Sequence, residues 1–156
     1  HAYILGEHGD SEVAAWSMTH LAGMPIDTYC RTSEKGAHFE KERLEIEKTV
    51  RDSAYHIIDA KGATYFAIGL ALVLIVRAIL RDQKSVLTVS TLLEGEYGLK
   101  DVCLSVPCIV SQKGIERIIV ADLSREEQDA LSVSGSVLRN ALLELQNAGK
   151  RRSSHY

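Results

Sequence analysis

Residues 85–121, SVLTVSTLLEGEYGLKDVCLSVPCIVSQKGIERIIVA, contain three runs rich in β-branched residues. The runs are Ser85–Leu92, Val102–Val110 and Ile115–Ala121, and short segments that contain glycine join them. β-Branched side chains fit the pleated surface of a sheet, and Gly114 can adopt the left-handed conformation of a short hairpin loop. This stretch therefore predicts an antiparallel meander.

Helical patterns precede the meander. Apolar residues recur from Glu40 onward at the spacing of one helix face, opposite a charged face, until Gly62 interrupts the pattern. The next segment, Ala63–Leu80, is apolar nearly all round, which predicts a helix that is covered on most sides. Because a domain of this size can hardly cover it unaided, we expect another domain or subunit to cover part of it. A shorter helix is predicted around Ala14–Ala22.

A capped helix is predicted after the meander. Ser124 and Glu127 have the spacing of a capping box, in which each side chain accepts a hydrogen bond from the other residue's backbone N–H. Gly149 is expected to end this helix. The leucines expected on its buried face are Leu131, Leu138, Leu142 and Leu145. The pattern as a whole predicts an α+β fold, a twisted antiparallel sheet packed with long helices, with one domain at 1–149 and a polar tail at 150–156.

Composition excludes several classes of protein. The 156 residues, 46% hydrophobic, can build one ordinary core, and a net charge of −3 without a basic patch argues against a nucleic-acid partner. The longest apolar run, Ala67–Val76, is shorter than the roughly 20 residues that span a bilayer. Cys30, Cys103 and Cys108 lack zinc-site spacing, so we expect buried, inert thiols, no metal and a cytoplasmic, reducing location.

The chain starts without methionine inside a strand-like segment, and we expect that a preceding part has been removed.

Chemistry is expected where the first predicted strand ends. Ala2–Leu5 is followed by the glycine-rich turn GEHGDS at 6–11. Histidine has an unperturbed pKa of about 6.5, which suits proton transfer near neutral pH, and Glu7 and Asp10 could help to keep His8 protonated. The alternative for an isolated motif of this kind is a turn histidine that is hydrogen-bonded to the backbone.

Two motifs occur in order along the chain. GEHGDSE at 6–12 is followed by AWS at 15–17 and, later, by KGATY at 61–65. Together they closely resemble the L-lactate dehydrogenase family, and the resemblance covers essentially the whole chain. It implies the substrate-binding half of a cytoplasmic, homotetrameric, NAD-dependent enzyme that interconverts pyruvate and L-lactate. The nucleotide-binding Rossmann domain would lie upstream of this chain.

The resemblance implies roles for four residues. His8 would be the general acid and base, which exchanges a proton with the substrate oxygen while the nicotinamide exchanges hydride. Thr64 would contact the substrate, and Ile68 would contact the nicotinamide ring and exclude water from the hydride path. His1 would bind a phosphate of fructose 1,6-bisphosphate across a subunit interface, as in allosteric bacterial members. Each of three residues also has a purely structural alternative. The Thr64 hydroxyl could bond to its own helix, and Ile68 could be an ordinary core residue. His1 could be a cloning remnant or a residue of a terminal strand.

The resemblance also implies groups that the chain lacks. These are an aspartate that orients the histidine, two arginines that act on the substrate, and the glycine-rich dinucleotide cradle. We therefore expect the isolated chain neither to bind NAD usefully nor to turn over lactate. A malate or other 2-hydroxy acid dehydrogenase is the nearest alternative, although Glu7 and Thr64 favour lactate. Two further alternatives are a non-catalytic assembly module and a hydrolase that uses Ser11, His8 and Asp10. The hydrolase is the weaker of the two, because residues so close in sequence seldom form a catalytic triad.

Overall fold

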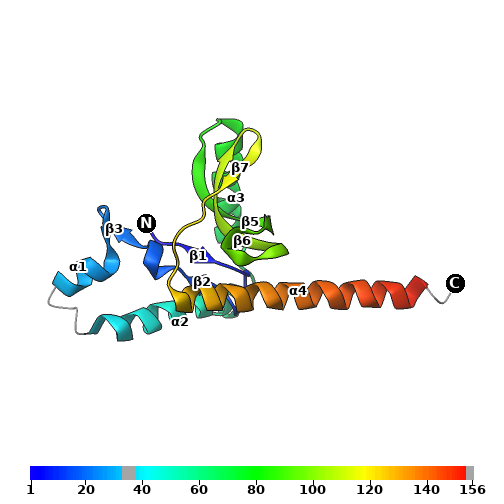
Figure 1. Ribbon diagram of the computed structural model, residues 1–156, viewed down its shortest axis with the longest axis horizontal. Coiled ribbons are helices and arrows are strands. Elements are labelled where there is room, and N and C mark those ends of the chain that lie inside the picture. The colour runs from blue at the N-terminus through cyan, green and yellow to red at the C-terminus, as the bar shows by residue number, and fades with distance from the viewer. Residues whose placement is uncertain (33–37, 154–156) are drawn as a thin grey trace.

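The computed structural model describes residues 1–32 and 38–153. In chain order the elements are β1 (Ile4–Leu5), β2 (Val13–Ala14), the 3-10 turn η1 (Trp16–Met18), β3 (His20–Leu21), β4 (Met24–Pro25), α1 (Ile26–Thr32), α2 (Phe39–Lys61), α3 (Tyr65–Leu80), β5 (Ser85–Glu94), the 3-10 turn η3 (Glu96–Gly98), β6 (Lys100–Ser111), β7 (Gly114–Ile118) and α4 (Arg125–Ser153). Figure 1 shows β5, β6, β7 and α3 standing upright on a base of α2 and α4, with β1 and β2 between them. The predicted α+β architecture is confirmed.

The sheet is the predicted antiparallel meander, with strand order β5-β6-β7. The third strand is shorter than predicted, because it ends at Ile118 and not at Ala121. The hydroxyl of Tyr97 explains this early end. It donates to the carbonyl of Ile119 at 2.9 Å and accepts from the amide of Ala121 at 3.2 Å, so these two backbone groups bond to a side chain, and the last backbone bond to β6 runs from the Ile119 amide to the Pro107 carbonyl at 2.8 Å.

The core lies against one face of β6. The inward-facing residues of this strand are Val102, Leu104, Val106, Cys108 and Val110, each at most 5% exposed. Leu5, Leu93 and Leu131 bring β1, β5 and α4 onto this face, and Leu138 packs beside them. Full burial of each aliphatic side chain stabilises the fold by about 1.5–3 kcal/mol. Alternation along the strand also corrects one prediction, because it places Cys103 on the exposed face while Cys108 is buried.

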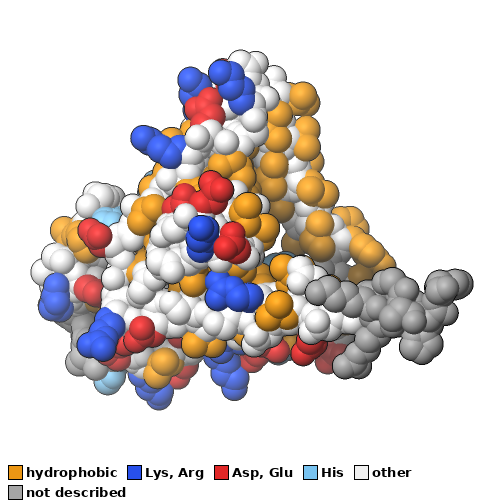
Figure 2. All heavy atoms as spheres, turned by 45° about the vertical axis from the view of Figure 1, so that its right-hand side comes forward, with side chains coloured by type: hydrophobic (Ala, Val, Ile, Leu, Met, Phe, Trp, Pro, Cys, Tyr) orange, Lys and Arg blue, Asp and Glu red, His pale blue; other side chains and the backbone are white. Residues whose placement is uncertain are grey.

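Helices α2 and α3 form as predicted and Gly62 separates them. Gly62 adopts a left-handed φ of 80°, and its N–H donates to the carbonyl of Ile58 at 2.7 Å. Most of the apolar surface of α3 is uncovered in this chain: Phe66 is 84% exposed and Leu80 is 79% exposed. Figure 2 shows hydrophobic side chains in a band along one side of the upright part. The expectation that another domain or subunit covers this helix stays a prediction.

The segment around β3 corrects another prediction. A helix was expected over Ala14–Ala22, but only η1 is helical there. His20–Leu21 pairs with Met24–Pro25 as a hairpin instead. Its two loop residues, Ala22 and Gly23, both have positive φ values of 50° and 82°, the combination found in the tightest hairpin turns. Pairing between the two short strands outweighs the weak helical pattern.

The capping box at the start of α4 is confirmed. The Ser124 amide donates to Glu127 Oε2 at 3.0 Å, and the Glu127 amide donates to Ser124 Oγ at 3.2 Å. The same carboxylate also accepts from the amide of Ser17 at 3.0 Å and from its hydroxyl. Glu127 is only 8% exposed. One side chain therefore caps α4 and ties it to the segment that follows β2.

The second half of α4 differs from the prediction. Leu142 is 48% exposed and Leu145 is 70% exposed, because this half of the helix projects beyond the sheet (Figure 1). The helix also continues through Gly149 to Ser153. The predicted tail at 150–156 thus begins inside a helix, and its residues 154–156 lie outside the described residues. The boundary of the domain stays a prediction.

We predict that Glu127→Ala lowers the free energy of unfolding of the chain by about 1–2 kcal/mol, because it removes a cap and leaves the amides of Ser17 and Ser124 without their protein acceptor. Denaturant unfolding followed by circular dichroism measures this change. Asp129→Ala, an exposed position on the same helix, is the matched control and should change stability by less than about 0.5 kcal/mol. Equal effects of the two substitutions would contradict the assignment.

Candidate active site

His8 lies in the turn that follows β1, where its side chain is exposed. The turn borders a pocket of about 180 Å³ between β1 and the sheet. Thr88 of β5 and Ser105 of β6 form the sheet side of this pocket. Its other lining residues are Ile4, Leu5, Gly6, Glu7, His8 and Glu12. The geometry presents an imidazole at the edge of a small, partly polar cavity, which is a suitable place to exchange a proton with a bound molecule.

Gly6 holds the beginning of the turn against β6. Its amide donates to the carbonyl of Ser105 at 2.9 Å, and the Ser105 amide donates to the carbonyl of Gly6 at 3.0 Å. Gly6 has a φ of 95°, and a Cβ placed there would lie 2.6 Å from Ser134 Oγ of α4. Only glycine fits both the backbone conformation and the space.

Ser134 holds the turn from the opposite side. The backbone amide of Glu7 donates to Ser134 Oγ at 2.7 Å, and the hydroxyl oxygens of Ser11 and Ser134 are 3.2 Å apart. Ser11 also donates to the carboxylate of Glu7. Ser134 is fully buried. The analysis of the sequence did not select it, although its position between Leu131 and Leu138 on the buried face of α4 was a signal that could have identified it.

The two carboxylates expected to act on His8 are bound to other groups. Glu7 accepts from Ser11, and Asp10 Oδ1 accepts from the hydroxyl of Tyr55 at 3.0 Å. The hydrogen bond to Asp10 raises the pKa of Tyr55 above its ordinary value. This contact connects α2 to the turn, so three elements of the fold hold it: β6, α4 and α2.

Glu12, on the far side of the turn from Glu7, is a further acidic residue near His8. Partial burial raises the pKa of Glu12, while the positive charges of Arg51 and His8 act in the opposite direction. Both Glu12 and Arg51 line a small pocket beside the turn. The sequence reading did not single out Glu12, because nothing in the local pattern distinguishes it from the neighbouring acids.

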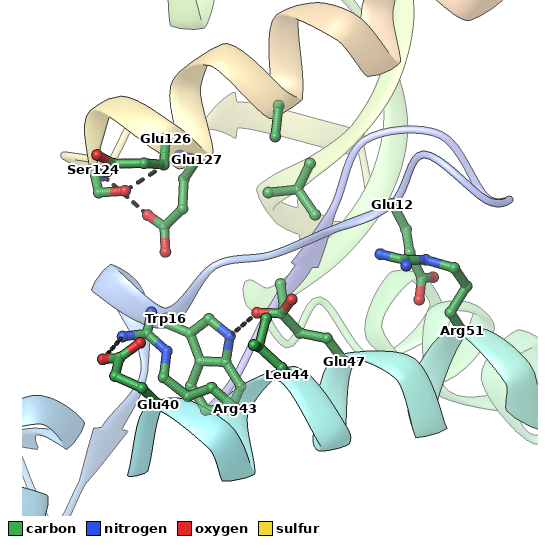
Figure 3. Close-up of a pocket in the computed structure, with 13 residues that line it drawn as sticks. Glu12, Trp16, Glu40, Arg43, Leu44, Glu47, Arg51, Ser124, Glu126 and Glu127 are labelled. Carbon is green, nitrogen blue, oxygen red and sulfur yellow. Dashed lines mark hydrogen bonds and ion pairs between the residues drawn. The ribbon is translucent and has the colours of Figure 1, made fainter. Parts of the chain in front are cut away.

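A larger pocket of about 500 Å³ lies between α2 and the start of α4, and Figure 3 shows its lining residues. Trp16 Nε1 donates to Glu47 Oε1 at 2.5 Å, and the Arg43 guanidinium lies 5.0 Å from the centre of the Trp16 ring. Arg43 also pairs with Glu40 at 3.3 Å. The contacts of Trp16 with Glu47 and Arg43 therefore join η1 to α2, whereas the Arg43–Glu40 pair lies within α2. None of the four predicted site residues lines it.

The structure places the other three predicted site residues outside the His8 pocket. Thr64 is half-buried immediately before α3, and among the described residues its side chain makes no capping hydrogen bond. Ile68, on the first turn of α3, is 52% exposed, which argues against the plain-core alternative. His1 is exposed, and its terminal amino group donates to the carbonyl of His20 at 2.8 Å. The roles of these residues stay predictions.

Within 1–32 and 38–153 no group of three or more histidine, cysteine, aspartate or glutamate side chains is arranged to hold a metal ion. No helix in the same ranges combines the length and the apolar character that crossing a bilayer requires.

Comparison with known proteins gives a consistent result. The family model of the lactate/malate dehydrogenase alpha/beta C-terminal domain matches residues 1–148. An L-lactate dehydrogenase of Treponema denticola is 58% identical over 147 residues, which cover 93% of this chain and 46% of that protein. The chain therefore spans about half the length of the curated relatives it matches.

Solved structures agree with the sequence comparison. The minor L-lactate dehydrogenase of Enterococcus mundtii, in its ligands-bound form, superposes with a TM-score of 0.83 at 45% identity, covering 91% of this chain and 45% of that one. A lactate dehydrogenase from a Medee basin deep-sea metagenome library superposes with a TM-score of 0.86 at 36% identity, covering 94% of this chain and 46% of that one.

We predict that Gly6→Ala lowers the free energy of unfolding by about 2–4 kcal/mol, because it combines an unfavourable φ with a steric clash against Ser134. Gly23→Ala is the matched control, since Gly23 has a φ of 82° but no atom within 4 Å of the added carbon. Its cost should be about 1 kcal/mol. Urea unfolding of the two variants measures the difference, and equal costs would show that the clash is absent.

Proposed function

The chain belongs to the lactate/malate dehydrogenase family, as its alpha/beta C-terminal domain, and we propose that it is the substrate-binding and catalytic half of an NAD-dependent L-lactate dehydrogenase. The observation that carries this proposal is the exposed imidazole of His8 on a turn that β6 and α4 hold from opposite sides. The similarity to proteins named L-lactate dehydrogenase supports lactate over malate as the substrate. The complete enzyme would include a nucleotide-binding domain that precedes this chain.

In the proposed reaction His8 moves a proton at its imidazole nitrogen. As an imidazolium it donates the proton to the carbonyl oxygen of pyruvate when hydride reaches the carbonyl carbon. In the reverse direction the neutral imidazole accepts the proton of the L-lactate hydroxyl. A correctly placed general acid or base contributes about 10²- to 10⁴-fold to a rate. Anchoring the backbone on both sides of His8 limits the positions that its side chain can adopt.

NAD would supply or accept the hydride and would be held mainly by the preceding domain. The residues of this chain fit only its nicotinamide end. Ile68 offers a half-exposed aliphatic surface that a nicotinamide ring could contact, and that contact would exclude water from the hydride path. The described residues contain no glycine-rich turn that opens a helix after a strand, which is the feature that binds a pyrophosphate.

Thr64 and His1 complete the proposed set of binding residues. The Thr64 side chain does not cap α3, so its hydroxyl is available to donate a hydrogen bond to the substrate. The exposed imidazole of His1 could bind a phosphate of fructose 1,6-bisphosphate at an interface between subunits. We also propose a cytoplasmic homotetramer as the complete enzyme, and the uncovered apolar surface of α3 supports assembly with further protein.

The geometry disfavours the hydrolase alternative. A serine nucleophile needs its hydroxyl hydrogen-bonded to the histidine, and the aspartate must orient that histidine. Ser11 instead donates to Glu7, and Asp10 accepts from Tyr55. Ser11, His8 and Asp10 are therefore neighbours in sequence that face different partners.

We predict that His8→Asn in the full-length protein lowers kcat for pyruvate reduction by about 10²- to 10⁴-fold, because the general acid is lost. The rate is measured from the absorbance of NADH under saturating substrate. His56→Asn is the matched control, since His56 is exposed on α2 and should leave kcat within twofold of the unsubstituted protein. A normal kcat in the His8 variant would exclude His8 as the proton donor.

We also predict that the isolated 156-residue chain neither oxidises NADH with pyruvate nor binds NADH with measurable affinity, because most of the cofactor site lies in the preceding domain. Fluorescence titration measures NADH binding, and the absorbance assay measures turnover. The full-length protein is the control. Turnover by the isolated chain would contradict the proposal that most of the cofactor site lies in the preceding domain.

A further inference from the structure

Three serines lie close together on α4, and one of them, Ser134, has a hydrogen-bond partner outside the helix. Ser132 Oγ donates to the carbonyl of Gln128 at 2.9 Å, and Ser136 Oγ donates to the carbonyl of Ser132 at 3.0 Å. This bond to the preceding helical turn is the usual partner of a serine in a helix. Ser134, which lies between them, instead accepts the amide of Glu7, 127 residues away in sequence.

The hydroxyl of Ser134 contacts both sides of His8. Glu7 immediately precedes the histidine, and its amide is 2.7 Å from Ser134 Oγ. Ser11 follows the histidine by three residues, and its hydroxyl oxygen is 3.2 Å from the same atom. A serine hydroxyl can take part in two hydrogen bonds at once, so one buried group connects the two sides of the turn.

The surroundings of Ser134 leave little room for movement. Ser134 is fully buried, and Gly6 approaches it so closely that a Cβ at Gly6 would lie 2.6 Å from its hydroxyl oxygen. Loss of the hydroxyl would leave the half-buried Glu7 amide without its acceptor, and the free-energy cost of an unpaired donor favours a backbone shift toward another acceptor. A shift of the backbone at Glu7 moves His8 with it.

We propose that Ser134 is a positioning residue that holds His8 in the orientation required for proton transfer. The proposal rests on the proposed function of His8. Ser134 does not touch the substrate; it acts through the backbone of the turn. Because misplacement of a catalytic group by 1 Å can cost about 10²-fold in rate, loss of this one hydroxyl should appear in the chemical step.

The experiment compares Ser134→Ala with Ser132→Ala in the full-length protein, with the unsubstituted protein and His8→Asn measured alongside. Ser134→Ala should lower kcat for pyruvate reduction by about 10- to 100-fold and change KM by less than about threefold. The deuterium isotope effect on kcat, measured with deuterated NADH, should rise because the chemical step becomes slower. A purely structural role would reduce the amount of active protein and leave that isotope effect unchanged. Ser132→Ala should keep kcat within twofold.

Hydrogen exchange measured by mass spectrometry tests the contact independently of activity. The peptide that contains the turn 6–11 should exchange faster in Ser134→Ala than in Ser132→Ala. If Ser134→Ala does not fold, Ser134→Cys keeps the shape of the side chain with a larger atom that is a much weaker acceptor, and the same changes are expected. A kcat equal to that of Ser132→Ala, an unchanged isotope effect, or unchanged exchange of the turn would overturn the proposal. An unsubstituted protein without lactate dehydrogenase activity would overturn the proposed function instead, and the exchange measurement would still decide whether Ser134 anchors the turn.

Discussion

The close approach of Gly6 to both β6 and α4 is the constraint on which the site depends. Two backbone hydrogen bonds tie Gly6 to Ser105, and the space for a Cβ is already taken by Ser134 Oγ. With a side chain at Gly6, the strand and the helix would have to move apart. The turn that carries His8 would then lose its contact with one of them. A single missing carbon atom thus allows sheet, helix and turn to meet.

Hydrogen-bonded buried polar groups and an exposed apolar surface occur together in this chain. The buried side chains of Ser134 and Glu127 are both hydrogen-bonded: Ser134 binds Glu7 at the turn, and Glu127 binds Ser17 and Ser124 at the start of α4. The apolar surface of α3, by contrast, is largely exposed. Polar groups near His8 are therefore preorganised within the domain, whereas the apolar side chains of α3 are largely exposed. That contrast agrees with the proposal that the domain completes its site with further protein.

Local patterns predicted much of the fold because their physical cause lies within a few residues. The meander follows from β-branched runs and turn glycines, the capping box from the spacing of Ser124 and Glu127, and the break at Gly62 from its left-handed conformation. Errors arose where pairing at a distance outweighed local preference. The hairpin at Ala22 and Gly23 replaced an expected helix, and α4 continued through Gly149 to Ser153.

The sequence by itself determined where proton chemistry was to be expected, because a glycine-rich turn with histidine is visible in consecutive residues. It also indicated the buried face in the first half of α4, where Leu131 and Leu138 pack in the core, since a period of 3.6 residues sorts side chains without further information. Only the tertiary structure decided which groups hold the turn. Ser134 and Glu7 are 127 residues apart, and their contact exists only after the sheet has brought β1 beside α4. No local pattern encodes such a meeting, because it depends on the packing of the whole core.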